Sequence, residues 1–225
     1  ECEGCFRIAN IGGKNGECNE KGGPSFDPTN CMLLESDADS TSSHGERYSG
    51  VIFSEDSHWF ADFEGVFGNR SNVELVLAEL LTPALVANRL RGHQWDLVNI
   101  DVGNGDCDFL HAIFENWEDD DASMPRFLLT KFVAMVPPEF SHSQRFDPRG
   151  SPMRLLETIG GSVQDAAWMR GCSLAAIWAL VRSTYALLWV SYERASWIRR
   201  DIFSNRILRT RLRYQKCMTH GGRDI

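Results

Sequence analysis

Residues that could bind a ligand or take part in catalysis follow a short apolar run, Leu97–Ile100. Asp101 comes directly after the run, a turn rich in Gly and Asn follows, and Asp106 and Asp108 then open an apolar helical pattern. A strand, a tight turn and a helix in this order place Asp101 where α/β enzymes bind ligands, outside the carboxyl ends of parallel strands. The same order also suits a surface turn in which Asp106 or Asp108 only caps the helix. This stretch alone leaves both interpretations open.

Two earlier stretches carry residues of a related kind. Phe6–Ile11 is typical of a buried strand and runs into Gly12–Gly16, where three glycines in five residues let a ligand approach the backbone closely. Gly50–Phe53 predicts a second strand, which ends in Ser54–Asp56. Doubly wound folds hold a nucleoside with such a glycine turn and with an acid that binds the ribose hydroxyls. The turn lacks GxGxxG spacing and no helix follows it at once, so a cofactor without a phosphate fits better than NAD.

The elements that must position these residues alternate along the chain. Apolar runs predict further strands over residues 73–77, 97–100, 127–134, 185–190 and 195–198. Helical spacing and capping residues predict helices over about 28–34, 59–67, 83–91, 109–117 and 173–182. Alternating strands and helices indicate an α/β, doubly wound and mostly parallel sheet covered on both faces. Right-handed crossovers then bring Gly12–Gly16, Glu55 and Asp101 to one edge of that sheet.

The composition limits the class of protein. The chain has 225 residues, of which 43% are hydrophobic and 24% charged, as in an ordinary soluble globular protein. Its formal net charge of -8 argues against nucleic acid as a partner. The most apolar late stretch, Cys172–Val190, contains Arg182 and suits a buried helix and a strand better than a membrane span. We expect one domain over residues 1–203 and a basic C-terminal helix or tail over 204–225.

The cysteines and one sequence triplet leave the cellular compartment open. Seven cysteines are an odd number, so at least one stays unpaired within a monomer. Cys2 and Cys5 form a CxxC motif, which suggests a zinc site or disulfides with later cysteines, although no second CxxC follows. Asn69-Arg70-Ser71 is a glycosylation sequon, which has meaning only in a secreted chain. Because the sequence begins with Glu1 rather than Met, we expect a preceding N-terminal segment, and the oligomeric state is also open.

The motifs, taken in order, resemble those of a known family. Asn10–Gly16 (NIGGKNG) resembles the first motif, D-I-G-A-N-D-G, of the FkbM-like methyltransferases, and Gly50–Asp56 resembles the second strand and ribose acid of that family. Asn99–Asp106 (NIDVGNGD) is similar to its fourth-strand motif. Gly171–Trp189 and Ala195–Arg199 look like its closing helix and strands. The resemblance spans nearly the whole chain and implies the Rossmann-like class I fold, a seven-stranded sheet with the last strand antiparallel.

The resemblance also implies a reaction and a set of site residues. The reaction is methyl transfer from S-adenosylmethionine to an oxygen of a small or sugar-like acceptor. The implied cofactor contacts are Asn10, Gly12, Gly13, Gly16, Glu55, Asp56 and Asp101. Asp101 would lie at the methionine end of the cofactor, Asp106 or His111 would take the acceptor proton, and a one-residue slip makes Ser54 an alternative ribose contact. The irregular insertion over residues 141–166 is expected to shape the acceptor pocket.

Three positions depart from the family pattern. Asn10 and Asn15 replace acids of the first motif, and Lys131 stands at an acidic position of the fifth strand, across the sheet from Asp101. We therefore expect no metal site built from carboxylates, because hard cations need several oxygen ligands. The first hypothesis is an S-adenosylmethionine-dependent O-methyltransferase. The alternative is a catalytically inactive methyltransferase-fold protein that serves as a binding or interaction module, and an NAD-linked oxidoreductase comes third.

Overall fold

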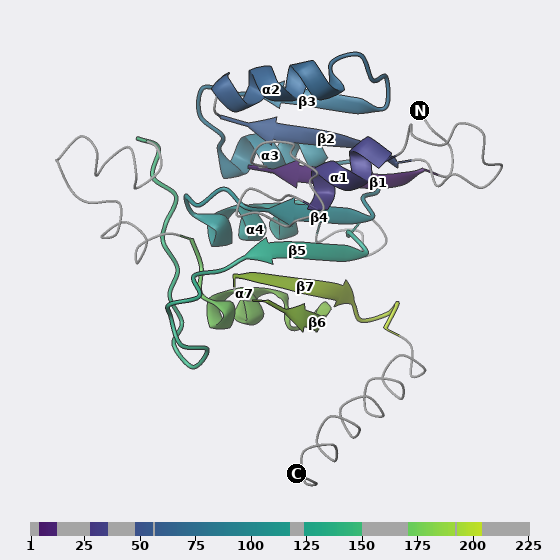
Figure 1. The fold of residues 1–225 in the computed structure, drawn as a ribbon. Coiled ribbons are helices and arrows are strands. Elements are labelled where there is room, and N and C mark those ends of the chain that lie inside the picture. The colour runs from purple at the N-terminus through teal and green to yellow at the C-terminus, as the bar shows by residue number, and fades with distance from the viewer. Residues whose placement is uncertain are drawn as a thin grey trace, which may run out of the picture.

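Seven strands form one sheet in the order β3-β2-β1-β4-β5-β7-β6 (Figure 1). The computed structural model describes residues 5–12, 28–35, 48–55, 57–117, 124–149, 171–191 and 193–203. The strands are β1 (Phe6–Ile11), β2 (Tyr48–Ser54), β3 (Val73–Leu77), β4 (Leu97–Ile100), β5 (Phe127–Lys131), β6 (Tyr185–Val190) and β7 (Arg194–Arg199). Strands β1 to β5 pair in parallel, whereas β7 is antiparallel to both of its neighbours. The expected seven-stranded sheet with an antiparallel last strand is confirmed.

Helices connect the strands, and two of them begin directly after a Ser or Thr cap. The described helices are α1 (Pro28–Glu35), α2 (Ser57–Phe67), α3 (Pro83–Leu90), α4 (Asp106–Glu115) and α7 (Leu174–Val181). The Thr82 hydroxyl accepts a hydrogen bond from the Leu85 amide at 3.2 Å and caps α3, and the Ser173 hydroxyl caps α7 in the same way. Over the described residues, none of the helices combines the length and the apolar character that crossing a bilayer requires.

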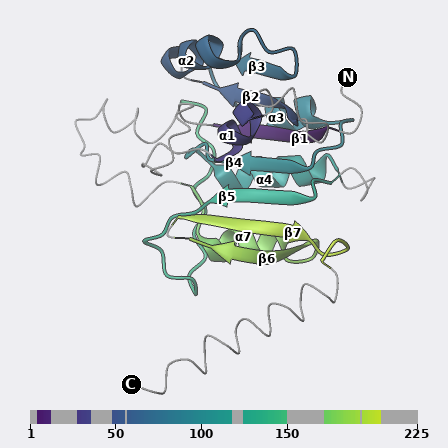
Figure 2. The same ribbon diagram turned by 45° about the vertical axis from the view of Figure 1, so that its right-hand side comes forward.

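The central strands send alternate side chains into two apolar layers. Ile8 and Ile52 pack with residues of α1 and α2, including the buried Phe63. Their neighbours Ala9 and Phe53 pack instead with residues of α3, α4 and α7. Because successive side chains of a strand point to opposite faces, α1 and α2 cover one face of the sheet and the other three helices cover the second (Figures 1 and 2). The predicted doubly wound α/β class is confirmed.

Two elements differ most from their predicted bounds. Strand β5 ends at Lys131 rather than at residue 134, because its parallel pairing with β4 ends at Thr130 and the Val133 amide turns to the Cys172 carbonyl at 2.7 Å. Helix α4 begins at Asp106 rather than near Phe109. Several predictions fall outside the described residues: those for Cys2, Gly13, Asn15, Gly16 and Asp56, for most of the insertion over 141–166, and for the tail over 204–225.

Candidate functional site

The candidate site lies where the strand order reverses, between β1 and β4, at the carboxyl ends of both strands. Doubly wound sheets open a binding crevice at this point. Gly12 follows β1 with a φ of +77°, and a Cβ placed there would come within 2.6 Å of the Asp101 carbonyl oxygen. The Asp101 amide in turn donates to the Ile11 carbonyl at 3.0 Å. The fold therefore brings Gly12 and Asp101 together, and only glycine fits the turn.

Glu55 lies at the same edge of the sheet, directly after β2. Its side chain is half-buried, and its Oε2 accepts a long hydrogen bond from the Leu81 amide at 3.5 Å. The neighbouring Ser54 is only 4% exposed. Of the two residues, Glu55 has the more accessible side chain and is the better candidate for a ribose contact.

Asp101 is 5% exposed and pairs with two cationic side chains. Its Oδ1 lies 3.3 Å from Lys131 Nζ at the end of β5, and its Oδ2 accepts a hydrogen bond from an Arg194 terminal nitrogen at 3.2 Å. Lys131 and Arg194 are register partners in the antiparallel pair of β5 and β7. The protein itself thus compensates the Asp101 charge. Lys131 was expected opposite Asp101, whereas Arg194 was missed because sequence patterns do not reveal the register of an antiparallel pair.

Asp106 is buried next to Asp101 and is compensated differently. Its Oδ1 accepts hydrogen bonds from the amides of Val102 at 2.9 Å and Gly103 at 3.0 Å. Burial, and then the negative charge of Asp101, raise the pKa of Asp106 to about 6, although the two amide hydrogen bonds oppose this rise. Its Oδ2 faces Gly171, where a Cβ would lie 2.5 Å from that oxygen. A carboxylate that titrates near neutrality at a sheet edge can accept a proton from a bound hydroxyl group.

Neither acid of the turn caps α4, contrary to one of the two interpretations. The N-cap is Gly105, whose φ of +76° leads into the helix without a side-chain hydrogen bond. Asp106 closes the turn that precedes the helix, because its carboxylate points back to the amides of that turn. The Asp108 carboxylate accepts a hydrogen bond from the Phe146 amide at 2.7 Å. Both carboxylates therefore accept hydrogen bonds from backbone amides outside the helix, and not from the first amides of α4.

His111 lies five residues beyond Asp106 on α4, which is about 7.5 Å further along the helix axis. Its side chain is 56% exposed, and its Nδ1 lies 3.4 Å from the Glu115 carboxylate on the next turn. The structure thus brings Asp106, but not His111, into contact with the turn at the sheet edge.

Asn10 ties three elements together at the centre of the sheet. It is fully buried, its Nδ2 donates to Asn30 Oδ1 of α1 at 2.8 Å, and its Oδ1 accepts from Asn99 Nδ2 of β4 at 2.8 Å. These bonds satisfy a buried amide that would otherwise destabilise the fold. The expectation that Asn10 contacts a cofactor stays a prediction.

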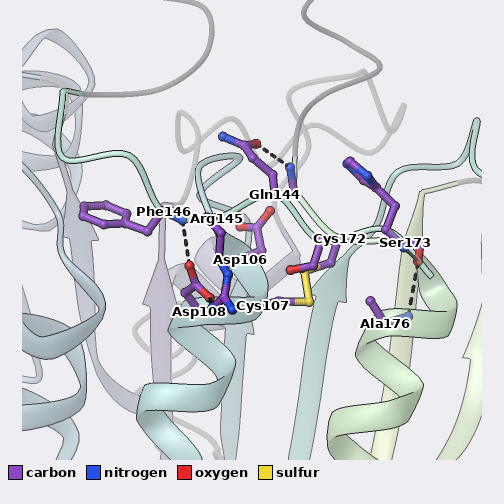
Figure 3. The surroundings of a disulfide bond; sticks show 12 residues. Asp106, Cys107, Asp108, Gln144, Arg145, Phe146, Cys172, Ser173 and Ala176 are labelled. Atoms are coloured by element: carbon purple, nitrogen blue, oxygen red, sulfur yellow. Dashed lines mark hydrogen bonds and ion pairs between the residues drawn. A yellow bond between two sulfur atoms is a disulfide. The ribbon is translucent and has the colours of Figure 1, made fainter.

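A disulfide joins Cys107 in the first turn of α4 to Cys172 just before α7 (Figure 3). The two Cα atoms lie 5.8 Å apart, and both side chains belong to the apolar layer under the site. Because Cys107 follows Asp106 directly, the disulfide fixes the start of the helix that carries this acid. This pair was missed because seven cysteines permit many pairings.

Residues 142–147, called the edge segment below, run across the start of α4. The Gln144 amide donates to the Gly171 carbonyl at 3.0 Å, and the Gly171 amide donates back to Gln144 Oε1 at 3.0 Å. Further along, the Phe146 amide is held by Asp108 (Figure 3). The edge segment therefore lies close to Asp106 and to the start of α4. It lies within the insertion over residues 141–166 that was expected to shape a pocket, but no sequence pattern indicated its contacts.

No family model and no curated protein matches the chain. Among solved structures, it is similar to a putative caffeoyl-CoA O-methyltransferase from Staphylococcus aureus, with a TM-score of 0.48 and 10% identity over 86% of this chain and 76% of that chain. An rRNA methylase from Streptococcus thermophilus gives a TM-score of 0.40 and 8% identity over 87% of both chains. CalO1, a methyltransferase in calicheamicin biosynthesis in its SAH-bound form, gives a TM-score of 0.41 and 14% identity over 88% of this chain and 50% of that chain. These likenesses concern the fold alone.

Proposed function

We propose that this protein is an S-adenosylmethionine-dependent methyltransferase that acts on an oxygen of a small or sugar-like acceptor. The observation that carries the proposal is the sheet itself. Its seven strands and antiparallel β7 are those that the motif resemblance implies, and Gly12 and Asp101 meet where the strand order reverses. Doubly wound sheets bind nucleoside cofactors at that point.

The residues of this edge suit a cofactor without phosphate groups. The backbone at Gly12 would line the cofactor, and the half-buried Glu55 carboxylate would accept hydrogen bonds from the ribose hydroxyls. When bound, the cofactor supplies a methyl group on a positively charged sulfur. The protein then has to orient the acceptor oxygen and take up its proton.

Asp106 is the better candidate for the proton-accepting group. Its pKa of about 6 makes it mostly ionised at neutral pH and still basic enough to accept a proton. Its Oδ1 is fixed by two amides, so its orientation is set before a ligand binds. His111 is exposed and paired with Glu115, which makes it the weaker candidate.

A second candidate function is a methyltransferase fold that binds or interacts without transferring a methyl group. Two observations favour it. The Asp101 carboxylate is engaged by Lys131 and Arg194, and the Asn10 amide is engaged by two other asparagines. Both residues were expected to contact the cofactor, so these internal contacts compete with that role.

Isothermal titration of the full chain with S-adenosylmethionine and with S-adenosylhomocysteine tests the proposal. We expect both ligands to bind and Glu55→Ala to weaken binding by about 2 kcal/mol, or about 30-fold, because charge-assisted hydrogen bonds are lost. Glu64→Ala is the matched control, since Glu64 is an exposed residue of α2. If neither ligand binds at millimolar concentration, the enzyme is excluded and the second candidate stands. If Glu55→Ala binds as wild type does, Glu55 is not the ribose contact.

A further inference from the structure

The turn between α2 and β3 carries the one Asn-x-Ser/Thr triplet of the sequence, Asn69-Arg70-Ser71, which methyl transfer does not use. We propose that Asn69 is an N-glycosylation site and that the chain matures in an oxidising, secretory compartment. This inference does not depend on the proposed function.

The turn presents the triplet in an accessible form. Asn69 and Ser71, the two residues that define a sequon, are exposed. Arg70 between them is half-buried, donates to the Leu33 carbonyl at 3.2 Å and lies 5.9 Å from the centre of the Phe67 ring. The middle residue therefore anchors the turn to the fold, while the two flanking residues stay on the surface.

A glycan at this turn would leave the candidate site uncovered. Val73 begins β3 directly after the triplet and pairs with Gly50 near the start of the parallel strand β2. The turn thus lies at the amino edge of the sheet, opposite the carboxyl edge that holds Gly12 and Asp101. In Figure 1 this turn is on the right, and the arrowheads of β2, β4 and β5 point to the left.

The cysteines point independently to the compartment in which sequons are modified. The Cys107–Cys172 disulfide is buried in the core, and Cys5 is also disulfide-bonded. Disulfides form and persist in oxidising compartments and are rare in the cytosol. Asparagine glycosylation takes place on secreted chains. The disulfides therefore support the compartment in which the exposed triplet would be glycosylated.

The chemistry needs a lipid-linked oligosaccharide diphosphate as donor and a membrane-bound transferase, both present along the secretory route. A bond forms between the Asn69 side-chain nitrogen and C1 of the first sugar. The bond between C1 and the diphosphate oxygen breaks, the lipid diphosphate leaves, and one amide proton is released. No atom is oxidised or reduced.

The test is secretion of the full chain behind a signal peptide from cultured eukaryotic cells. We expect the wild-type chain to be heavier than its polypeptide mass. Peptide N-glycosidase should remove the excess and leave aspartate at position 69, which peptide mass spectrometry detects. Asn69→Gln and Ser71→Ala should lack the excess mass, whereas Ser71→Thr should keep it because Asn-x-Thr is also a sequon.

Two results would overturn the inference. One is a secreted wild-type chain that contains the Cys107–Cys172 cross-linked peptide but carries an unmodified Asn69. The other is a secreted and folded chain in which Cys107 and Cys172 are free thiols, because the disulfide is the argument for an oxidising compartment. Ser71→Ala tests the same site without altering Asn69, so a folding failure of one variant does not remove the test.

Discussion

At the scale of single residues, Asp101 and Asp106 show how two neighbouring carboxylates acquire different properties. Asp101 faces two cations, Lys131 and Arg194, whereas Asp106 faces two backbone amides and the negative charge of Asp101. Loss of hydration is therefore balanced by two direct ion pairs at Asp101, and at Asp106 by backbone amides with a smaller contribution from the Lys131 charge. Carboxylates separated in this way can take different roles, one structural and the other in proton transfer.

Replacing Asp106 with Asn should stabilise the protein above pH 6. The Asp106 carboxyl titrates near 3.8 in the unfolded chain and at about 6 in the folded protein, so the folded state binds more protons between these values. Stability therefore falls as the pH rises through this window, by at most about 3 kcal/mol. The free energy of unfolding, measured with urea at pH 8, should be higher for Asp106→Asn than for wild type by up to this amount. The difference should disappear near pH 4. A difference that stays constant from pH 4 to pH 8 would contradict the raised pKa.

At the scale of elements, local patterns predicted the helices and strands, the meeting of Gly12 with Asp101 and the place of Lys131, but not the longer-range contacts that complete the site. Thr82 and Ser173 indicated where two helices begin, and the apolar runs located the strands, because capping and alternation act over a few residues. The Arg194 contact to Asp101 joins residues 93 positions apart, and the disulfide spans 65. Such contacts depend on strand register and on cysteine pairing, which short-range patterns do not encode.

Gly105 allows the edge segment to close against α4, and its substitution tests this contact. Gly105 and Gly103 belong to one turn and have φ values of +76° and +71°. A Cβ on Gly105 would lie 2.6 Å from the Phe146 Cα, whereas a Cβ on Gly103 would meet nothing within 4 Å. Both alanine variants lose about 1 kcal/mol to the left-handed backbone, and Gly105→Ala should lose about 2 kcal/mol more through overpacking.

Chemical unfolding gives the two free energies, and hydrogen exchange of the Phe146 amide reports on the edge segment. We expect faster exchange in Gly105→Ala alone, because only that variant displaces the amide from Asp108. Equal unfolding free energies for the two variants would mean that the edge segment moves aside without cost.

At the scale of the whole molecule, the disulfide links the two parts of the sheet that supply Asp101 and Arg194. Helix α4 follows β4, at the reversal point where a cofactor is expected, and α7 leads into β6 and β7, which supplies Arg194. The Cys107–Cys172 bond joins the first turn of α4 to the residues just before α7, beneath the edge segment (Figure 3). It therefore restrains the side of the site where Asp106 and the edge segment lie.

Removing this disulfide should lower the stability of the whole molecule. A cross-link across 65 residues restricts the unfolded chain by about 4 kcal/mol, so Cys107→Ala with Cys172→Ala should lose up to that amount. Alanine is the suitable replacement because both sites are buried and a serine hydroxyl would need a new partner. Reduced wild type should also lose stability, but reduction affects the Cys5 disulfide as well. The stability that the double variant loses on reduction measures the effect of the other disulfides. Subtracting it from the stability that wild type loses on reduction gives the contribution of Cys107–Cys172. A remainder near zero would show that packing of α4 against the core, rather than the covalent bond, holds this side of the site in place.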